Sequence, residues 1–366
     1  MSSYSEFIEL KKQSGLHSPS VSEMSSLGID IRVDSCFLCN PYAFDLFMEY
    51  YNQSELSDYV KYYPPQNAIL AKELSESLGL DPDYVFLGNG AIQIIELILR
   101  EYYGHKKVIV TPTFSTYYEY DEENISYFKT RKEENFKINV EKLIEFSKGA
   151  TVLVLVNPNN PTGSTLTKSE IMTIVDSLED TTVIVDESFI DFFDSENSVE
   201  REVYNRYNLI VLRSMSKDFG IAGLRLGYSV LNPIAKTGLF HKYGLLWNIN
   251  GLAHFFIQIT KEKAFKDRYL RARDFYLKGR EIFYNKLKGI EGLKTYPSKS
   301  NFFLVEKEQN IEEVFSLLLF EYGIYTRILN DKRDLNGSFL RVACGKENDN
   351  EYIHRSLKEI FVVKSE

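Results

Sequence analysis

Cysteine and histidine are scarce in this sequence. Its 366 residues include three cysteines and five histidines. Three cysteines cannot form a disulfide framework. Cys36 and Cys39 have the C-x-x-C spacing, but no second pair of cysteines or histidines follows at the spacing of a zinc site. We therefore expect both to be ordinary small residues, and we predict no metal site.

Long apolar runs, internal repeats and excess positive charge are missing too. No stretch approaches the roughly 18 apolar residues of a membrane-spanning helix. Residues 1–6 lack the basic start of a secretion signal. The net charge of −9 argues against nucleic acid or an anionic membrane as principal partner, although a local basic pocket could still bind a small anion. We expect a cytoplasmic protein with no nucleic-acid partner and no membrane partner.

Length and hydrophobic content are those of a globular protein with two structural domains. The chain has 366 residues, of which 44% are hydrophobic. A helical pattern with interleaved charges over about residues 252–287 predicts a long connecting helix, and shorter elements after residue 294 predict a small α+β domain. We place an N-terminal arm that packs on the small domain at residues 1–45, a large domain at 46–255 and the small domain at 256–366.

What the sequence does contain is a regular alternation of apolar strands and helices. The expected strands are residues 84–87, 107–110, 151–156, 182–185 and 209–212. Continuously apolar strands that alternate with helices predict an α/β fold, with a mostly parallel sheet covered on both faces. Ligands of such sheets bind beyond the carboxyl ends of the strands. The residues that fall at that edge are Gly90, Phe114, Asn160, Asp186 and Lys217.

The segment from residue 213 to residue 225, RSMSKDFGIAGLR, carries the clearest chemical signal. Lys217 follows a buried strand, where desolvation favours the neutral, nucleophilic amine. Ser214, Ser216 and Arg225 are the donors that a phosphate monoester needs around it. One ligand with both an aldehyde and a phosphate is pyridoxal phosphate (PLP). The alternative is a surface Ser/Lys loop between two strands.

From about residue 40 to residue 345, the sequence resembles the fold type I PLP enzymes of the class I/II aminotransferase group. Within that group it is most similar to histidinol-phosphate aminotransferases and threonine-phosphate decarboxylases. The motifs that carry the resemblance are Asn40-Pro41, Tyr63-Pro64, Gly88-Asn89-Gly90, Thr111 through Phe114, Asn157 through Gly163, Asp186-Glu187, Ser214 through Lys217 with Arg225, and Leu340-Arg341-Val342. The resemblance implies a large PLP-binding domain, a smaller α+β C-terminal domain, and a homodimer with shared active sites.

The resemblance also implies how the cofactor would be bound. Lys217 would hold PLP as a Schiff base and move a proton, and Asp186 would pair with the pyridine nitrogen. Asn160 would donate a hydrogen bond to the ring oxygen, and Phe114 would lie against the ring face. The residues expected around the cofactor's phosphate are Gly90, Ala91, Ile92, Ser214, Ser216, Arg225 and, from the neighbouring subunit, Tyr63.

The substrate residues implied by the resemblance indicate a small phosphorylated compound. Arg341 would bind the α-carboxylate as a two-pronged ion pair. Arg327, fourteen residues earlier, would contact the substrate's own phosphate. His17 would assist at that phosphate, and Asn40 completes the expected substrate-binding set.

Two departures from the pattern of many relatives bear on the reaction. Phe189 stands where many have tyrosine, and Ile92 stands where many have an acidic or hydroxyl residue. Phe189 favours a decarboxylase, because threonine-phosphate decarboxylases share it. The larger number of aminotransferases with this fold favours amino transfer. A binding module without turnover is a third alternative, which intact Lys217 and Asp186 argue against.

Our main expectation is therefore an aminotransferase that moves an amino group between an amino acid, such as L-glutamate, and a small phosphorylated carbonyl compound. The alternative is a decarboxylase of a phosphorylated L-amino acid, phosphothreonine or phosphoserine, that gives an amine phosphate. Which one applies depends on whether the Cα–H or the Cα–carboxylate bond stands perpendicular to the cofactor ring.

Overall fold

The computed structural model describes residues 4–15, 17–243, 245–308 and 310–362. Its largest element is a seven-stranded sheet with the strand order β2-β8-β7-β6-β5-β3-β4. The strands are β2 (Val85–Asn89), β3 (Lys107–Thr111), β4 (Ile125–Lys129), β5 (Val152–Val156), β6 (Thr182–Asp186), β7 (Leu209–Ser214) and β8 (Leu226–Val230). Strands β3 to β7 pair in parallel, and β8 is antiparallel to both β2 and β7. The predicted mostly parallel sheet is confirmed.

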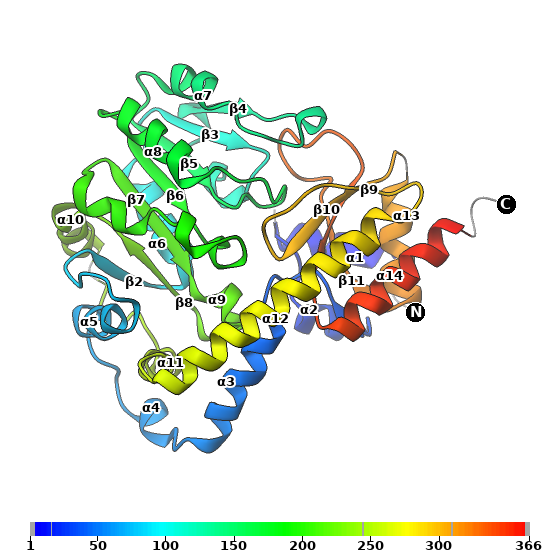
Figure 1. Cartoon of the computed structure of the whole chain (residues 1–366), viewed down its shortest axis with the longest axis horizontal. Coiled ribbons are helices and arrows are strands. Elements are labelled where there is room, and N and C mark those ends of the chain that lie inside the picture. The colour runs from blue at the N-terminus through cyan, green and yellow to red at the C-terminus, as the bar shows by residue number, and fades with distance from the viewer. Residues whose placement is uncertain (1–3, 16, 244, 309, 363–366) are drawn as a thin grey trace.

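Helices cover both faces of this sheet (Figure 1). The helices of this part of the chain are α3 (Pro41–Gln53), α4 (Ser57–Lys61), α5 (Asn67–Leu78), α6 (Gly90–Glu101), α7 (Val140–Ser147), α8 (Lys168–Ser177), α9 (Met215–Asp218), α10 (Pro233–Tyr243) and α11 (Gly251–Thr260). Along β5, Leu153 and Leu155 enter one apolar core, while Val152, Val154 and Val156 enter the other. Because successive side chains of a strand point to opposite faces, a strand buried on both sides is apolar throughout.

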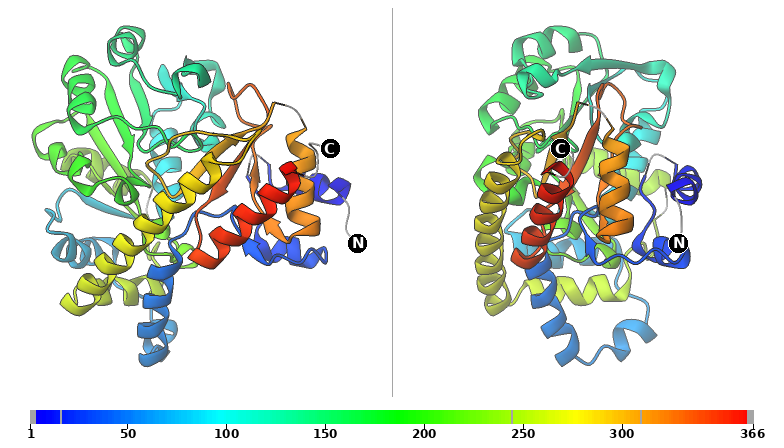
Figure 2. Two further views of the ribbon diagram at one scale, coloured as in Figure 1. Left: turned by 45° about the vertical axis from the view of Figure 1, so that its right-hand side comes forward. Right: turned by 90° about the vertical axis from the view of Figure 1, so that its right-hand side faces the viewer.

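A second, smaller part of the molecule is built from both ends of the chain. Its elements are α1 (Tyr4–Gln13), α2 (Val21–Ser26), β1 (Val33–Asp34), β9 (Lys294–Thr295), β10 (Phe302–Glu306), α13 (Ile311–Ser316), β11 (Ile324–Tyr325), β12 (Arg327–Ile328), β13 (Phe339–Ala343) and α14 (Glu347–Val362). One sheet has the order β12-β13-β10-β9, and β1 pairs with β11. Phe7 and Met24 share an apolar core with Phe302 and Leu357. The first and last described helices therefore belong to the same part of the molecule, with Phe7 of α1 packed on Phe315 of α13 (Figure 2). The domain limits at residues 45 and 255 stay predictions.

The connection between the two parts differs from the single long helix expected over residues 252–287. It consists of α11, which ends at Thr260, and α12 (Lys263–Lys288), which has 26 residues and reaches the small sheet (Figure 1). Helix α11 ends where the backbone N–H of Lys261 donates to the carbonyl oxygens of Gln258 and Ile259. No glycine or proline marks the break, so periodicity alone could not locate it. None of the helices in the described ranges is both long and apolar enough to cross a membrane.

Candidate active site

A cavity of about 360 Å³ lies at the carboxyl ends of the central strands. Residues from the N-terminal segment, the large sheet and the small sheet line it together. The predicted residues that line it are His17, Ala91, Ile92, Phe114, Asn160, Asp186, Ser214, Ser216, Lys217, Arg225, Arg327 and Arg341. The fold thus brings most of the predicted site together, although these residues are spread over more than 300 positions of sequence.

Lys217 lies in α9, the short helix that begins directly after β7. Its amine forms no hydrogen bond or ion pair with any residue of the described part of the chain. Burial lowers the pKa of Lys217, and the positive charges of Arg341 and Arg225 lower it further, against Cys39 and Asp186. A desolvated amine that faces a cavity and has no protein partner is suited to act as a nucleophile or base.

Asp186, at the end of β6, is buried, and both of its carboxylate oxygens accept hydrogen bonds. Its Oδ1 accepts bonds from the backbone N–H of Ser188 (2.9 Å) and from the Ser188 hydroxyl (2.6 Å), and its Oδ2 accepts one from the Tyr117 hydroxyl (2.9 Å). Burial raises the pKa of Asp186, whereas these three bonds and the charge of Lys217 oppose the rise. The bonds therefore fix the carboxylate's orientation and favour its charged form.

The start of α6 and the side chain of Arg225 form a cradle with the composition of a phosphate site. A Cβ atom at Gly90 would collide with the guanidinium of Arg225, so this close approach requires glycine there. The backbone N–H of Gly90 bonds to the carbonyl of Arg225 (2.9 Å). The Ser216 hydroxyl is buried and has no partner among the described residues. A helix N-terminus, a guanidinium and an unpaired hydroxyl match what the phosphate of PLP would need.

Two arginines of the small sheet stand directly opposite each other. Arg327 of β12 and Arg341 of β13 are register partners in an antiparallel pair, and both line the cavity. Arg341 donates to Oδ1 of Asn160 and to the carbonyl of Cys36, both at 2.7 Å and both neutral. Burial lowers the pKa of Arg341 to about 10, with Arg327 adding to the effect. Like charges opposite each other destabilise a sheet, so this pair favours an anionic ligand between them.

The cavity as a whole is positively charged, in contrast to the chain's net charge of −9. Its only lining carboxylate in the described residues is Asp186. The side chains of fixed or potential positive charge that line it are His17, Lys217, Arg225, Arg327, Lys332 and Arg341. A site with this balance is suited to a ligand, or a pair of ligands, with several negative charges.

His17 and Phe114 lie together at one wall of the cavity. Their ring centroids are 5.7 Å apart, and Nε2 of His17 is 3.7 Å from Oε1 of Glu119. Burial lowers the pKa of His17, while Glu119 opposes this. His17 therefore stands near both the expected ring position and the cationic end of the cavity.

Three predicted residues, Gly90, Asn40 and Tyr63, do not line the cavity. Asn40 is buried and caps α3, where its side chain accepts bonds from the next turn, and its backbone N–H bonds to the carbonyl of Lys217 (2.8 Å). Tyr63 is 81% exposed, and its ring lies 4.9 Å from that of Trp247. The expected substrate contact of Asn40 and the expected contact of Tyr63 with a neighbouring subunit stay predictions.

Sequence reasoning missed Tyr117, Ser188 and Lys332. Tyr117 and Ser188 both hydrogen-bond Asp186, and Lys332 lines the cavity. A signal existed for the first two, because each lies two or three residues from a predicted site residue. Lys332 stands in the connection between β12 and β13, where no motif marked it.

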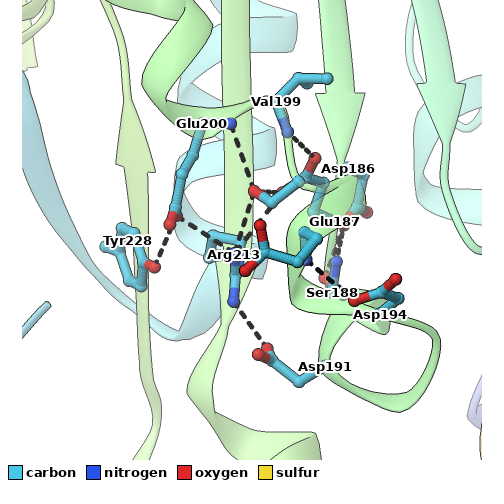
Figure 3. A network of polar contacts seen from close by, with 11 residues as sticks. Asp186, Glu187, Ser188, Asp191, Asp194, Val199, Glu200, Arg213 and Tyr228 are labelled. Carbon is cyan, nitrogen blue, oxygen red and sulfur yellow. Dashed lines mark hydrogen bonds and ion pairs between the residues drawn. The ribbon is translucent and has the colours of Figure 1, made fainter. Parts of the chain in front are cut away.

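A buried ionic network lies behind the cavity, at the ends of β6 and β7 (Figure 3). Arg213, four residues before Lys217, contacts Asp191 (2.6 Å), Glu200 (3.1 Å) and Glu187 (3.5 Å). The backbone N–H of Glu187 also bonds to the carbonyl of Leu212, the neighbouring residue on β7 (2.8 Å). The network therefore joins the strand that carries Asp186 to the strand that leads into Lys217.

Comparison with known proteins shows the family to which the chain belongs. The sequence profile of the family described as aminotransferase class I and II matches residues 47–357. The chain belongs to this family. Its enzymes depend on PLP. The predicted resemblance, fold and cofactor are confirmed.

Relatives that match nearly the whole chain correct our main functional expectation. An L-serine phosphate decarboxylase of Campylobacter jejuni is 38% identical over 96% of this chain and 95% of its own length. A solved structure of a decarboxylase from Sulfurospirillum multivorans is 34% identical, with a TM-score of 0.90, and the match covers 98% of this chain and 95% of that one. A histidinol-phosphate aminotransferase of Methanocaldococcus jannaschii is 31% identical over 83% of each chain. The expectation of an aminotransferase with an amino-acid donor was wrong, and the findings favour the decarboxylase alternative.

Proposed function

We propose that this protein is a PLP-dependent decarboxylase of a small phosphorylated L-amino acid, with O-phospho-L-serine as the preferred substrate. The reaction breaks the bond between Cα and the carboxylate, releases carbon dioxide, and places a proton on Cα to give phosphoethanolamine. The observation that carries the proposal is the opposed pair Arg327 and Arg341, one cation for each anionic end of such a substrate. The decarboxylase relatives over nearly the whole chain support the same substrate class.

The residues present fit PLP at the edge of the large sheet. When bound, PLP withdraws electrons from Cα of an attached amino acid, so that a bond to Cα can break. Lys217 would hold the cofactor, and Asp186 would pair with its ring nitrogen. The cofactor's phosphate would be held at the α6 N-terminus, with Arg225, Ser214 and Ser216 as donors.

The substrate's orientation decides which bond breaks, and two anchors set that orientation. Arg341 would hold the carboxylate, while Arg327 and His17 would hold the substrate's phosphate. Two fixed ends would prevent rotation about the Cα–N bond, and so would select which bond to Cα breaks. Phe189 lines the cavity and packs edge to face on Phe302, with ring centroids 5.3 Å apart, so it supplies no hydroxyl there.

Lys217 would deliver the proton that replaces carbon dioxide on Cα. Its buried position lowers its pKa, which makes the ammonium a better proton donor than an exposed lysine. The amine has no described protein partner to restrain it, so it can reach Cα from the cofactor's side. This role replaces the shuttling of an α-proton that amino transfer would require.

The proposal includes a homodimer with shared active sites and a cytoplasmic location. Tyr63 is the residue that would cross to the partner's cofactor phosphate. Its exposure supports this role, because an aromatic ring 81% exposed beside Trp247 is poorly placed for a monomer. Exposed apolar side chains nearby, Val60 and Leu246, extend the same surface.

The experiment that tests the reaction uses the holoenzyme with no keto acid present. We expect carbon dioxide and phosphoethanolamine from O-phospho-L-serine, measured by gas release and by 31P NMR. L-glutamate should leave the visible absorbance of the bound cofactor unchanged. Bleaching by L-glutamate, with no carbon dioxide from phosphoserine or phosphothreonine, would refute the proposal.

The phosphate anchor has its own test. Arg327→Ala should raise KM for O-phospho-L-serine while the spectral change caused by L-serine keeps its midpoint. Arg333→Ala is a matched control, because Arg333 lies in the connection that follows β12 but pairs with Glu122 outside the cavity. An equal loss for both amino acids would show that Arg327 has a structural role only.

A further inference from the structure

Lys332 is a cavity residue whose amine forms no ion pair with a carboxylate of the described residues. It lies in the connection between β12 and β13, the strands that carry Arg327 and Arg341, and it lines the cavity with both. Its amine donates to the hydroxyl of Ser115 at 3.1 Å, which is its single hydrogen bond in the described residues. Ser115 directly follows Phe114, so Lys332 spans from the small sheet to the wall of the cofactor site.

The position of Lys332 is fixed by the neighbouring residues of its loop. Asp334 accepts a hydrogen bond from the Thr111 hydroxyl at 2.8 Å and forms an ion pair with Lys129 at 2.7 Å. Arg333 pairs with Glu122. The two residues that follow Lys332 are therefore held against the large part of the molecule, Asp334 at the ends of β3 and β4 and Arg333 at Glu122. A side chain held this way is preorganised to meet a ligand.

The charged groups around Lys332 come from four separate segments. Arg327 and Arg341 face it as cations, Asp331 and Glu119 face it as anions, and His17 faces it as an imidazole whose pKa burial lowers. Both anions have other partners: Asp331 pairs with Arg327 (2.6 Å) and Lys11 (3.4 Å), and Glu119 is nearest to His17 (3.7 Å).

The amine of Lys332 therefore has no ion-pair partner of its own among the described carboxylates. Burial and the charge of Arg327 lower the pKa of Lys332 to about 7, which is the expected response to this lack.

We propose that Lys332 is a ligand of the substrate's phosphate and selects phosphorylated over unphosphorylated amino acids. This inference rests on the proposed function and adds a third phosphate ligand, beyond Arg327 and His17, to that end of the cavity. A phosphate monoester is nearly a dianion at neutral pH, since its second pKa is about 6. Such an ion would supply the negative charge that Lys332 lacks.

Binding of phosphate to Lys332 would be accompanied by proton uptake, which a lysine with a purely structural role would not show. A bound dianion raises the pKa of a neighbouring amine, so Lys332 would take up a proton when phosphate binds above pH 7. The contribution of Lys332 to phosphate affinity would be complete below the pKa that Lys332 has in the free enzyme. This contribution would be lost as pH rises through the higher pKa that Lys332 has in the phosphate complex.

The test measures binding of inorganic phosphate to the holoenzyme by calorimetry, in buffers of different ionisation enthalpy at pH 8. For Lys332→Met we expect a Kd about 10- to 100-fold higher than that of the wild type, from the loss of one charge-assisted hydrogen bond. Lys332→Arg should keep the affinity but lose the proton uptake, because arginine stays charged. Lys148→Met, which removes an exposed lysine that pairs with Glu145 outside the cavity, should behave as the wild type does.

The substrate arm of the test separates this inference from the proposed function. Lys332→Met should raise KM for O-phospho-L-serine more than it lowers kcat, and the midpoint of the L-serine spectral change should not move. Unchanged phosphate affinity in Lys332→Met, or no phosphate binding by the wild type, would overturn the inference. If the wild type binds phosphate through Lys332 but releases no carbon dioxide from phosphoserine, the inference stands and the proposed reaction fails.

Discussion

The Tyr117 hydroxyl donates a hydrogen bond of 2.9 Å to Oδ2 of Asp186, and both side chains are buried. Burial and the adjacent carboxylate raise the pKa of Tyr117 well above its usual value, so the phenol stays protonated and remains a donor. The bond in turn opposes the rise that burial causes in the pKa of Asp186. Tyr117 is therefore a positioning residue for the carboxylate expected at the ring nitrogen.

Replacing Tyr117 with phenylalanine should lower activity without unfolding the protein. The change removes one donor to a buried carboxylate, which raises the pKa of Asp186 and weakens its charge. We expect kcat to fall about 10- to 100-fold, the range for one hydrogen bond to a charged group. The acid limb of the pH–kcat profile should shift to higher pH.

Tyr118→Phe is the matched control, because Tyr118 is the adjacent tyrosine and its hydroxyl is not among the groups that hydrogen-bond Asp186. It should keep wild-type kcat. A loss of the same size in both variants would assign the effect to packing and remove the role given to Tyr117.

Glu187 makes stability depend on pH in a direction opposite to that of most carboxylates. Burial raises the pKa of Glu187 from 4.5 to about 7, despite opposing contributions from Arg213 and Ser198. A carboxyl with a higher pKa in the folded state stabilises the fold fully below its unfolded pKa, and that contribution is lost as pH rises through 7. The free energy of unfolding should therefore fall by roughly 3 kcal/mol between pH 4.5 and 7 through this group alone.

The measurement is urea unfolding of the wild type and of Glu187→Gln across that range. The difference between the two proteins isolates Glu187 from other titrating groups. Identical pH slopes for both proteins would show that Glu187 ionises normally inside the fold.

Arg213 should contribute more to stability than any exposed arginine. Removing it by Arg213→Met would leave Glu187, Asp191 and Glu200 buried near one another without their cation. Breaking such a buried ion pair costs about 3–5 kcal/mol. Arg206→Met is the control, since Arg206 pairs with the 56% exposed Asp176 and should cost about 1 kcal/mol or less. Equal midpoints in urea for the two variants would contradict the prediction.

The shared active site can be tested with mixed dimers. Lys217→Ala lacks the cofactor lysine, and Tyr63→Ala lacks the residue expected to cross the interface. When the two inactive variants are unfolded and refolded together, half of the dimers should be mixed, and each mixed dimer has one intact site. About a quarter of wild-type activity should return. Activity that stays at the level of the separate variants would show that Tyr63 serves its own subunit.

The large sheet and the edge that carries the site could be predicted because local sequence determines them. A strand such as Val152–Val156 is apolar throughout only when both of its faces are buried, and the polar residue that follows each strand marks the ligand edge. Lys217 and Asp186 were therefore found from spacing and order. The break between α11 and α12 was not found, because both halves keep a helical pattern.

The contacts that tune the site could not be predicted for a different reason. Tyr117 and Asp186 are 69 positions apart, and Ser115 and Lys332 are 217 positions apart. The first pair forms only when the strands of the large sheet assemble, and the second only when the small part of the molecule packs on the large one. The choice of reaction was missed because it depends on rotation about one substrate bond. Phe189 pointed to the decarboxylase, but the number of aminotransferases with this fold outweighed it.

The opposed arginines of the small sheet also favour a compact ligand. Cross-strand partners place their Cβ atoms about 5 Å apart. A ligand held by both Arg327 and Arg341 would have its two anionic groups close together, as the carboxylate and the phosphate of O-phospho-L-serine are on adjacent carbons. A methyl group on Cβ would leave the separation unchanged, so any preference for phosphoserine over phosphothreonine has to arise from the space around that carbon.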